Sequence, residues 1–171
     1  MRKIMVGLIF SIFCGLNLFG GDFELGVNYF DKGDFTKATN IFKKDCESGN
    51  IDSCYNLGFI YASGQGVKQD YFKAKELFSK TCDGGNPNGC YALGVMYNDG
   101  QGVKQDHFKA NEFYKKSCDV GNIDACYNLA ISYKKGRGVK QDTKKAKELF
   151  GKVCDLGDQG GCDAYAKLNK Q

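Results

Sequence analysis

Apolar residues recur along this chain at the spacing of amphipathic helices. Leu57 and Tyr61 lie four residues apart, and Ala74, Leu77 and Phe78 follow at steps of three and one. Steps of three and four place side chains on one face of a helix, which then packs against a core. The pattern therefore predicts two helices in this stretch, with these residues in the core, and it indicates no cofactor pocket.

Short polar residues and glycines mark the expected ends of the helices. Asn50 stands where a helix N-cap is expected, and Gly64 can end that helix with a left-handed residue. Pro87, the one proline, fits the first position of a further helix. The N-cap positions recur at Asn50, Asn86, Asn122 and Asp158 for first helices and at Asp34, Asp70, Asp106 and Asp142 for second helices. The expected ends are Gly33, Gly64, Gly100 and Gly136, and then Gly49, Gly85, Gly121 and Gly157.

The helix pairs belong to an internal repeat of 36 residues. The segment "YNLGFIYASGQGVKQDYFKAKELFSKTC" at 55–82 matches residues 91–118 and 127–154, and an earlier copy at 23–46 is four residues shorter in the "GQGVKQ" loop. Gly58 and Gly94 are expected to let the helices approach closely. The predicted organisation is repeats 22–54, 55–90, 91–126 and 127–162, followed by a C-terminal capping segment at 163–171.

Two known repeats resemble these copies. In the short first copy, Leu25, Gly26, Tyr29, Ala38 and Phe42 keep the spacing of a tetratricopeptide repeat. The longer copies, with their "GxGVKQD" loops, resemble Sel-one-like repeats, and their Cys-x7-Cys pairs are similar to those of the Helicobacter cysteine-rich proteins. The resemblance implies an all-α fold, a right-handed α-α superhelical solenoid of helix hairpins. This sequence departs from the family pattern in two places, in its short first copy and at Ala130, where the other copies have glycine.

The N-terminus has the layout of a secretory signal peptide. Arg2 and Lys3 precede a stretch without charge that ends with Gly20 and Gly21. We therefore expect residues 1–21 to be removed and the mature protein to be secreted, to the periplasm or beyond, with no stable membrane span. An uncleaved membrane anchor is the alternative.

The cysteines fit structural disulfides. Cleavage of the signal removes Cys14 and leaves eight of the nine cysteines, each pair at the end of one helix and the start of the next. Such a reversal can bring Cα atoms within the ~4.4 to 6.8 Å that a disulfide requires. Zinc would favour closer cysteines or added histidines, and a redox site would favour Cys-x-x-Cys. The predicted bonds are Cys46–Cys54, Cys82–Cys90, Cys118–Cys126 and Cys154–Cys162, which implies an oxidising compartment.

Most catalytic and cofactor motifs fail here. "GQGVKQ" lacks a third glycine and follows a helix, so it is a turn rather than a phosphate loop. His107, the one histidine, is expected to face solvent, and no metal site or cofactor is predicted. The net charge of +4 falls to +2 without Arg2 and Lys3. So small a positive charge does not indicate a nucleic-acid-binding protein.

The resemblance implies penicillin binding and weak beta-lactamase activity, with slow hydrolysis of penicillin and cephalosporin nuclei. A beta-lactam or a peptidoglycan-derived small molecule is then the expected ligand. Ser132 and Lys135 form one S-x-x-K match, but the other serine beta-lactamase motifs are missing. Ser132 also aligns with Ile60 and Met96, which favours an inward-facing helix position. The catalytic residues, and whether the protein is an enzyme, therefore stay unknown.

The alternative is a scaffold that binds a peptide or a protein. A solenoid of helix pairs offers a concave face lined by its first helices. The candidate ligand-binding residues there are Asn56 and Asn128, whose amides could bond a ligand backbone or could simply be solvated. Ser63, Asp99 and Lys135 vary in charge at nearby positions. The last full repeat is strongly basic, which is typical of a solvated face but could also attract an anionic partner.

Overall fold

The computed structural model of the 171-residue chain describes residues 21–170. In this part of the chain the regular structure is helical throughout, and no strand is present. The predicted signal peptide lies outside the described residues except for Gly21, the first residue of α1. The helices are α1 (Gly21–Asp31), α2 (Phe35–Glu47), α3 (Ile51–Ser63), α4 (Tyr71–Asp83), α5 (Pro87–Asp99), α6 (His107–Asp119), α7 (Ile123–Lys135), α8 (Thr143–Asp155) and α9 (Gln159–Asn169).

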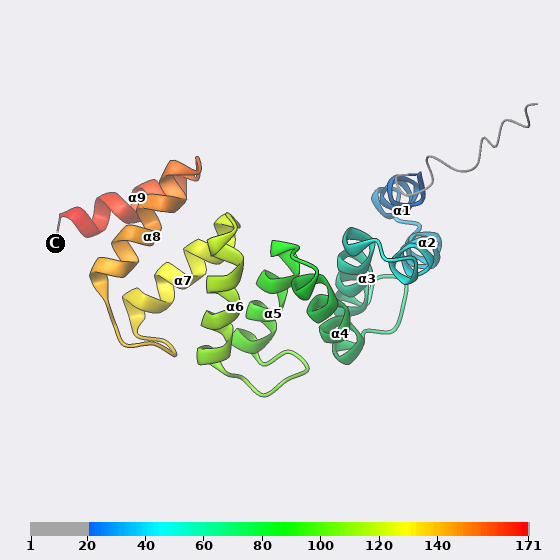
Figure 1. Ribbon diagram of the computed structural model, residues 1–171, viewed down its shortest axis with the longest axis horizontal. Helices are drawn as coiled ribbons and strands as arrows, with labels where there is room; N and C mark the ends of the chain where they lie inside the picture. Colours follow the sequence, from blue (N-terminus) through cyan, green and yellow to red (C-terminus); the bar gives the residue numbers. More distant parts are fainter. Residues whose placement is uncertain (1–20, 171) are drawn as a thin grey trace, which may run out of the picture.

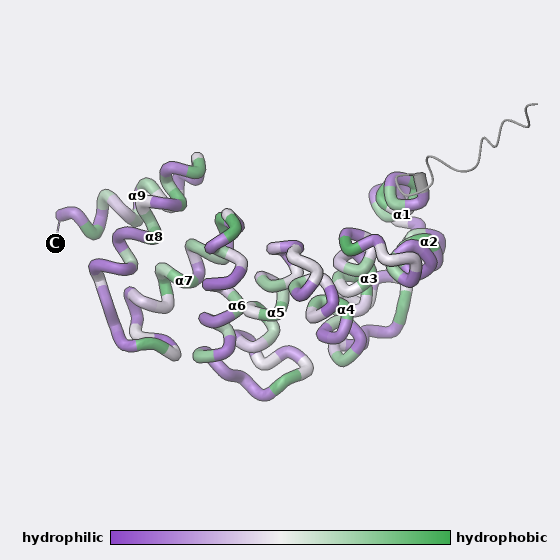
Figure 2. Tube along the Cα trace, in the orientation of Figure 1, coloured by the Kyte–Doolittle hydropathy of each residue, from purple (hydrophilic) through white to green (hydrophobic). Residues whose placement is uncertain are grey.

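The helices form a solenoid of antiparallel hairpins, which confirms the predicted all-α fold. Each helix packs chiefly against its neighbours in sequence, and α5 also touches α7. The array is elongated and arched, with α1 and α9 at opposite ends (Figure 1). Hydrophobic segments are spread along the whole array instead of gathering at one centre (Figure 2). Stability therefore depends on each interface between neighbouring helices, as expected for a repeat protein.

The predicted helix starts are confirmed. Asn50 Oδ1 accepts a hydrogen bond from Ser53 N at 3.0 Å, and Asp106 Oδ1 accepts one from Lys109 N at 3.0 Å. The other expected N-cap residues act in the same way, since each accepts from a backbone N–H of the first helical turn. Gly64, Gly100 and Gly136 end the first helices in the left-handed conformation.

Small residues allow the helices of each hairpin to approach closely. A Cβ atom at Gly58 would lie 2.8 Å from the Phe78 ring, and one at Gly94 would meet the Tyr114 ring. Buried residues then fill the space between successive hairpins. They form four clusters along the chain, around Phe42 and Ile60, Phe78 and Leu93, Tyr114 and Leu129, and Phe150 and Ala130.

The longer loops pack on the preceding repeat. Gly138 has a φ of +64°, and a Cβ there would lie 2.6 Å from the backbone nitrogen of Phe108 and closer still to the carbonyl of His107. Asn111 Nδ2 donates to the carbonyl of Arg137 at 2.6 Å and ties the same loop to α6. In the first hairpin the loop is residues 32–34 instead of a longer loop such as 64–70, so the four missing residues do lie there.

Substitution of Gly138 should therefore loosen this loop. We expect Gly138→Ala to lower the free energy of unfolding by about 1–3 kcal/mol, because the side chain would strain a left-handed backbone and strike the start of α6. Thermal unfolding of the two proteins measures the difference. Gly121→Ala is the control, because Gly121 also has a positive φ but open space around its Cβ position. An equal loss in both variants would show that the contact with α6 contributes nothing.

The C-terminal helix packs on α8 through Leu168, which is buried. Lys167, Asn169 and Lys170 are exposed, as expected for the polar end of this segment. Within residues 21–170, no helix is both long enough and apolar enough to cross a bilayer.

Candidate binding surfaces

Four disulfides join successive hairpins, and they confirm the predicted pairing. They are Cys46–Cys54, Cys82–Cys90, Cys118–Cys126 and Cys154–Cys162. Each links the last turn of one second helix to the first turn of the next first helix, with Cα atoms 4.5–4.7 Å apart. These bonds indicate that the protein matures in an oxidising compartment.

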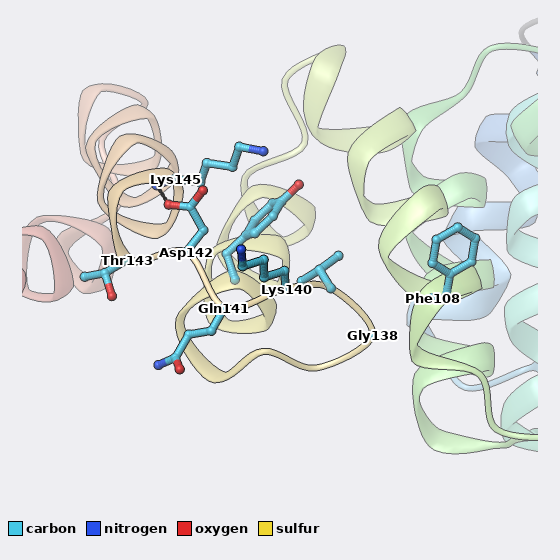
Figure 3. Close-up of a pocket in the computed structure, with 9 residues that line it drawn as sticks. Phe108, Gly138, Lys140, Gln141, Asp142, Thr143 and Lys145 are labelled. Atoms are coloured by element: carbon cyan, nitrogen blue, oxygen red, sulfur yellow. Dashed lines mark hydrogen bonds between the residues drawn. The ribbon is translucent and has the colours of Figure 1, made fainter.

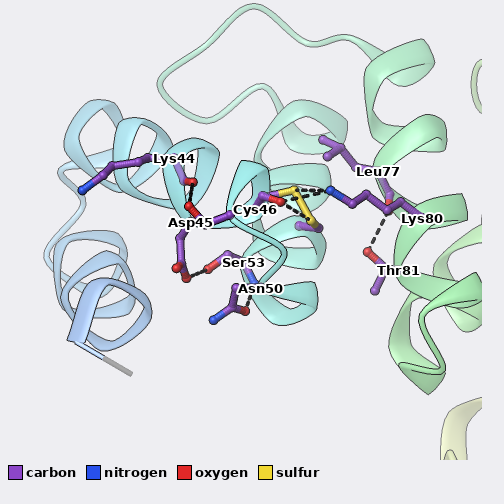
Figure 4. The surroundings of a disulfide bond; sticks show 10 residues. Lys44, Asp45, Cys46, Asn50, Ser53, Leu77, Lys80 and Thr81 are labelled. Carbon is purple, nitrogen blue, oxygen red and sulfur yellow. Dashed lines mark hydrogen bonds between the residues drawn. A yellow bond between two sulfur atoms is a disulfide. The ribbon is translucent and has the colours of Figure 1, made fainter. Parts of the chain in front are cut away.

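Lysines from the following repeat contact two of these disulfides. Lys80 Nζ donates to the carbonyl of Cys46 at 3.0 Å and lies 3.8 Å from its sulfur (Figure 4). Lys152 Nζ makes the same contacts with Cys118, at 2.7 and 3.8 Å. On the other side of the first disulfide, Ser53 Oγ donates to the buried carboxylate of Asp45 at 2.5 Å (Figure 4). At these two disulfides, the lysine thus ties the second helix of the following repeat to the two helices that the disulfide joins.

Removal of such a lysine should weaken the stacking of repeats. We expect Lys152→Met to lower the free energy of unfolding by about 1–3 kcal/mol, because the part-buried carbonyl of Cys118 loses a charged donor. Lys116→Met is the matched control. Lys116 occupies the same register but pairs with exposed Asp83 at 3.6 Å, and loss of such a pair should cost under about 1 kcal/mol. Urea unfolding curves that gave equal losses would contradict the assignment.

A polar cleft lies between the first helices α5 and α7. It has a volume of about 250 Å³, and Tyr114 of α6 contributes to its lining. Asp99 Oδ1 accepts a hydrogen bond from Asn98 Nδ2 at 2.7 Å, and Asn98 Oδ1 lies 3.2 Å from His107 Nδ1. We call this space the inner cleft, and its lining residues are Tyr91, Val95, Asn98, Asp99, Tyr114, Asn128, Ile131, Ser132 and Arg137.

The phenols of the inner cleft stay protonated at neutral pH. Burial raises the pKa of Tyr91, and the charge of Asp124 raises it further, while the neighbouring Asn128 amide lowers it. Burial also raises the pKa of Tyr114, with Tyr91 and Asp99 adding to the effect. Both hydroxyls can therefore donate hydrogen bonds. The lining of the cleft thus combines phenol and amide groups with the carboxylate of Asp99 and the guanidinium of Arg137.

The structure separates the two asparagines that the sequence singled out. Asn128 lines the inner cleft together with Asp99, whereas Asn56 lies half-buried on α3, outside it. Ser63 and Lys135 are exposed at the ends of α3 and α7. Sequence reasoning missed Tyr91, because the tyrosine fitted the core pattern, and it counted Arg137 only among the basic residues of the last full repeat.

Two further sequence interpretations can be compared with the structure. His107, which the sequence analysis expects to face solvent, is only partly exposed and lies beside Asn98. Ser132 is 6% exposed and lines the inner cleft, while Lys135 is exposed. Among the hydrogen bonds of the described residues, none joins these two side chains. Within residues 21–170, no three side chains of histidine, cysteine, aspartate or glutamate gather in a group that could hold a metal ion.

Two equivalent pockets lie outside the inner cleft, beside the longer loops. One has a volume of about 830 Å³ and is lined by Phe108 of α6, Tyr133, the loop residues 138–142 and Thr143 of α8 (Figure 3). The other, of about 660 Å³, is lined by Phe72, Tyr97 and residues 102–106, so it is the same pocket one repeat earlier. We call the surface that contains both the loop edge.

Comparison with known proteins gives the family of this chain. The family described as Sel1 repeat matches residues 51–86, 87–122 and 123–158, which are more than half of the chain. The matched segments are 36-residue units that begin four residues earlier than the predicted repeats 55–90, 91–126 and 127–162.

Two curated relatives come from Helicobacter pylori, and their names mark them provisionally as beta-lactamases. HcpE of strain J99 is 34% identical over 70 residues, which cover 39% of this chain and 20% of HcpE. HcpC of strain 26695 is 41% identical over 45 residues, which cover 26% of this chain and 16% of HcpC. The matches thus span a fifth or less of the length of these relatives.

Solved structures share the fold. The cysteine-rich protein B of Helicobacter pylori is 32% identical with a TM-score of 0.61, over 76% of this chain and 93% of that one. A protective antigen of uropathogenic Escherichia coli with an SLR fold has a TM-score of 0.83 at 27% identity, over 88% and 33%. A Sel1 repeat protein of Oxalobacter formigenes has a TM-score of 0.80 at 24% identity, over 88% and 63%. On its repeats and its stapled cysteines, the chain belongs to the Sel1 repeat family, in the group of the Helicobacter cysteine-rich proteins.

Proposed function

We propose that this protein is a secreted scaffold, in the periplasm or outside the cell, that binds an extended peptide segment in the inner cleft. The observation that carries the proposal is the row of unlike polar groups between α5 and α7. Amide and phenol groups can bond the backbone of a peptide, and Asp99 and Arg137 can bind its charged groups. The disulfides support the extracytoplasmic location, because such bonds persist in oxidising compartments.

Disulfides also fix the helices on both sides of the inner cleft, which favours peptide binding. The helices on both sides are stapled to their neighbours, by Cys82–Cys90 before α5 and by Cys118–Cys126 before α7. Rigid walls reduce the ordering that binding would otherwise require. The starts of α5 and α7 are therefore fixed before a ligand arrives.

A selection from random 12-residue peptides on the oxidised protein tests this proposal. We expect Asn128→Ala to weaken binding of the selected peptides at least fivefold, measured by fluorescence anisotropy. The variant loses an amide whose hydrogen bond to the peptide contributes about 1 kcal/mol. Asn40→Ala, at an exposed position of α2, is the control. The proposal that the inner cleft binds peptides is refuted if no selected peptide binds Asn128→Ala more weakly than the wild type. A matching loss in Asn56→Ala would extend the binding surface to α3.

Beta-lactam binding with slow hydrolysis is the second candidate. It is favoured by the names of the Helicobacter relatives and by Ser132, which lines the inner cleft. A lysine that activates the serine would have to lie within hydrogen-bond reach. Lys135 lies three residues away on α7 and is exposed. Purified oxidised protein and Ser132→Ala should be compared with a chromogenic cephalosporin, and turnover that Ser132→Ala abolishes would establish the hydrolase.

A further inference from the structure

We propose that the loop edge is a second docking surface, for an acidic peptide segment that also carries apolar side chains. This surface goes beyond the inner cleft and shares none of its lining residues. It consists of two pockets one repeat apart, so one extended segment can engage both.

Two phenylalanines are exposed on the loop edge without a structural need. Phe72 and Phe108 occupy the second position of α4 and α6 and are 65% and 60% exposed. The same register holds Thr36 in α2 and Lys144 in α8, so the fold accepts a polar residue there. Beside each phenylalanine, residues of the following loop line the pocket, 102–105 next to Phe72 and 138–142 next to Phe108. A single exposed apolar residue is common on a protein surface, but here each ring borders a pocket that a valine and a tyrosine also line.

The pockets have partly apolar walls that are already in place. Val139 and Tyr133 face the same pocket as Phe108, and Val103 and Tyr97 do so with Phe72. The loops are held by side chains: Gln141 Nε2 donates to the carbonyl of Lys134 at 3.0 Å, and its counterpart Gln105 to that of Asn98 at 2.7 Å. Together with the tie between Asn111 and Arg137, these bonds prepare the loops for binding.

The charge of the pockets selects an anionic partner. Lys75, Lys104 and Lys109 line one pocket, and Lys140 and Lys145 line the other. The carboxylates among the lining residues are Asp106 and Asp142, and each accepts a hydrogen bond from the first turn of its helix at 3.0 Å. The lysines therefore present excess positive charge.

A peptide satisfies these features better than an anionic polymer does. Glutamate and aspartate side chains complement the lysines, and an aliphatic or aromatic side chain covers the phenylalanine and the valine of each pocket. A polymer that carries charge alone would leave Phe72 and Phe108 uncovered. The chemistry of the ligand is therefore acidic residues interspersed with apolar ones.

The test uses random 12-residue peptides displayed on phage, with the oxidised protein as bait. We expect one selected class to be rich in Asp and Glu together with Phe, Leu or Ile. A synthetic member of that class should bind at least tenfold more weakly to the double variant Phe72→Ala and Phe108→Ala, and also to Lys104→Glu with Lys140→Glu. The exposed Lys43 and Lys167 lie elsewhere, so Lys43→Glu with Lys167→Glu controls for net charge.

The outcomes separate the two surfaces. Retained binding by Asn128→Ala together with loss in the phenylalanine variant supports the loop edge, even if the inner cleft proves to bind nothing. The loop edge is refuted if no acidic class is selected, or if the class binds the phenylalanine variant as tightly as the wild type. It is also refuted if polyglutamate competes fully for the lysines while the phenylalanine variant binds normally, since charge alone would then explain the binding. Circular dichroism confirms that each variant is folded.

Discussion

Reduction of the four disulfides should unfold the protein or lower its melting temperature sharply. Each bond closes a loop with a sequence separation of eight residues, and the chain-entropy model gives about 2–3 kcal/mol for a loop of this length. Four such bonds sum to about 10 kcal/mol, which is comparable to the whole free energy of unfolding of a typical domain, about 5–15 kcal/mol. A solenoid is sensitive to this loss because each repeat is held by its neighbours.

Differential scanning calorimetry of oxidised protein and of reduced, alkylated protein measures the effect. The paired variant Cys82→Ser with Cys90→Ser should lose about a quarter of the total, because it opens one of the four staples. Equal melting temperatures for the oxidised and the reduced protein would show that the disulfides do not stabilise the fold. Peptide mapping that found links between distant cysteines would contradict the structure itself.

Truncation of Phe150 should produce the second large effect. Its side chain is fully buried in the cluster formed by α7, α8 and α9, and its ring lies 5.3 Å from that of Tyr127. We expect Phe150→Ala to lower the free energy of unfolding by about 3–5 kcal/mol, because it removes buried apolar surface and leaves a cavity. Phe72→Ala is the matched control, and at 65% exposure it should change the stability by under about 0.5 kcal/mol.

Hydrogen exchange adds a test that is specific to a repeat protein. Loss of Phe150 should speed exchange in α7–α9 and leave α1–α3 unchanged, since the contacts of each helix are with its neighbours. Uniformly faster exchange would instead show that the chain unfolds as one cooperative unit. A loss in Phe72→Ala as large as that in Phe150→Ala would contradict the burial that separates them.

The fold was predictable because its determinants are local. Local contacts depend on residues a few positions apart, so their spacing can be read from the sequence. Examples are the N-caps Asn50 and Asp106 and the disulfide between Cys82 and Cys90. The repeat then multiplied each local signal. A period of 36 residues shows which glycines and aspartates mark boundaries and which are incidental.

The candidate surfaces were harder to predict because they depend on how repeats stack. The contact of Lys152 with Cys118 spans 34 residues, and the inner cleft joins Tyr91 of α5 with Arg137 beyond α7. Helical periodicity says which face a residue occupies but not the angle between successive hairpins. The contact of His107 with Asn98 has a different origin, because it depends on the path of the loop within a single hairpin.

The short span of the four disulfides has a consequence for biogenesis. A chain that enters an oxidising compartment from its N-terminus presents both cysteines of a pair almost together, because they are only eight positions apart. Each hairpin junction can thus be oxidised before the next pair arrives, in the order of translocation. We therefore expect oxidation of the reduced chain to give the native pairing with an oxidase alone, without an isomerase that reshuffles wrong pairings.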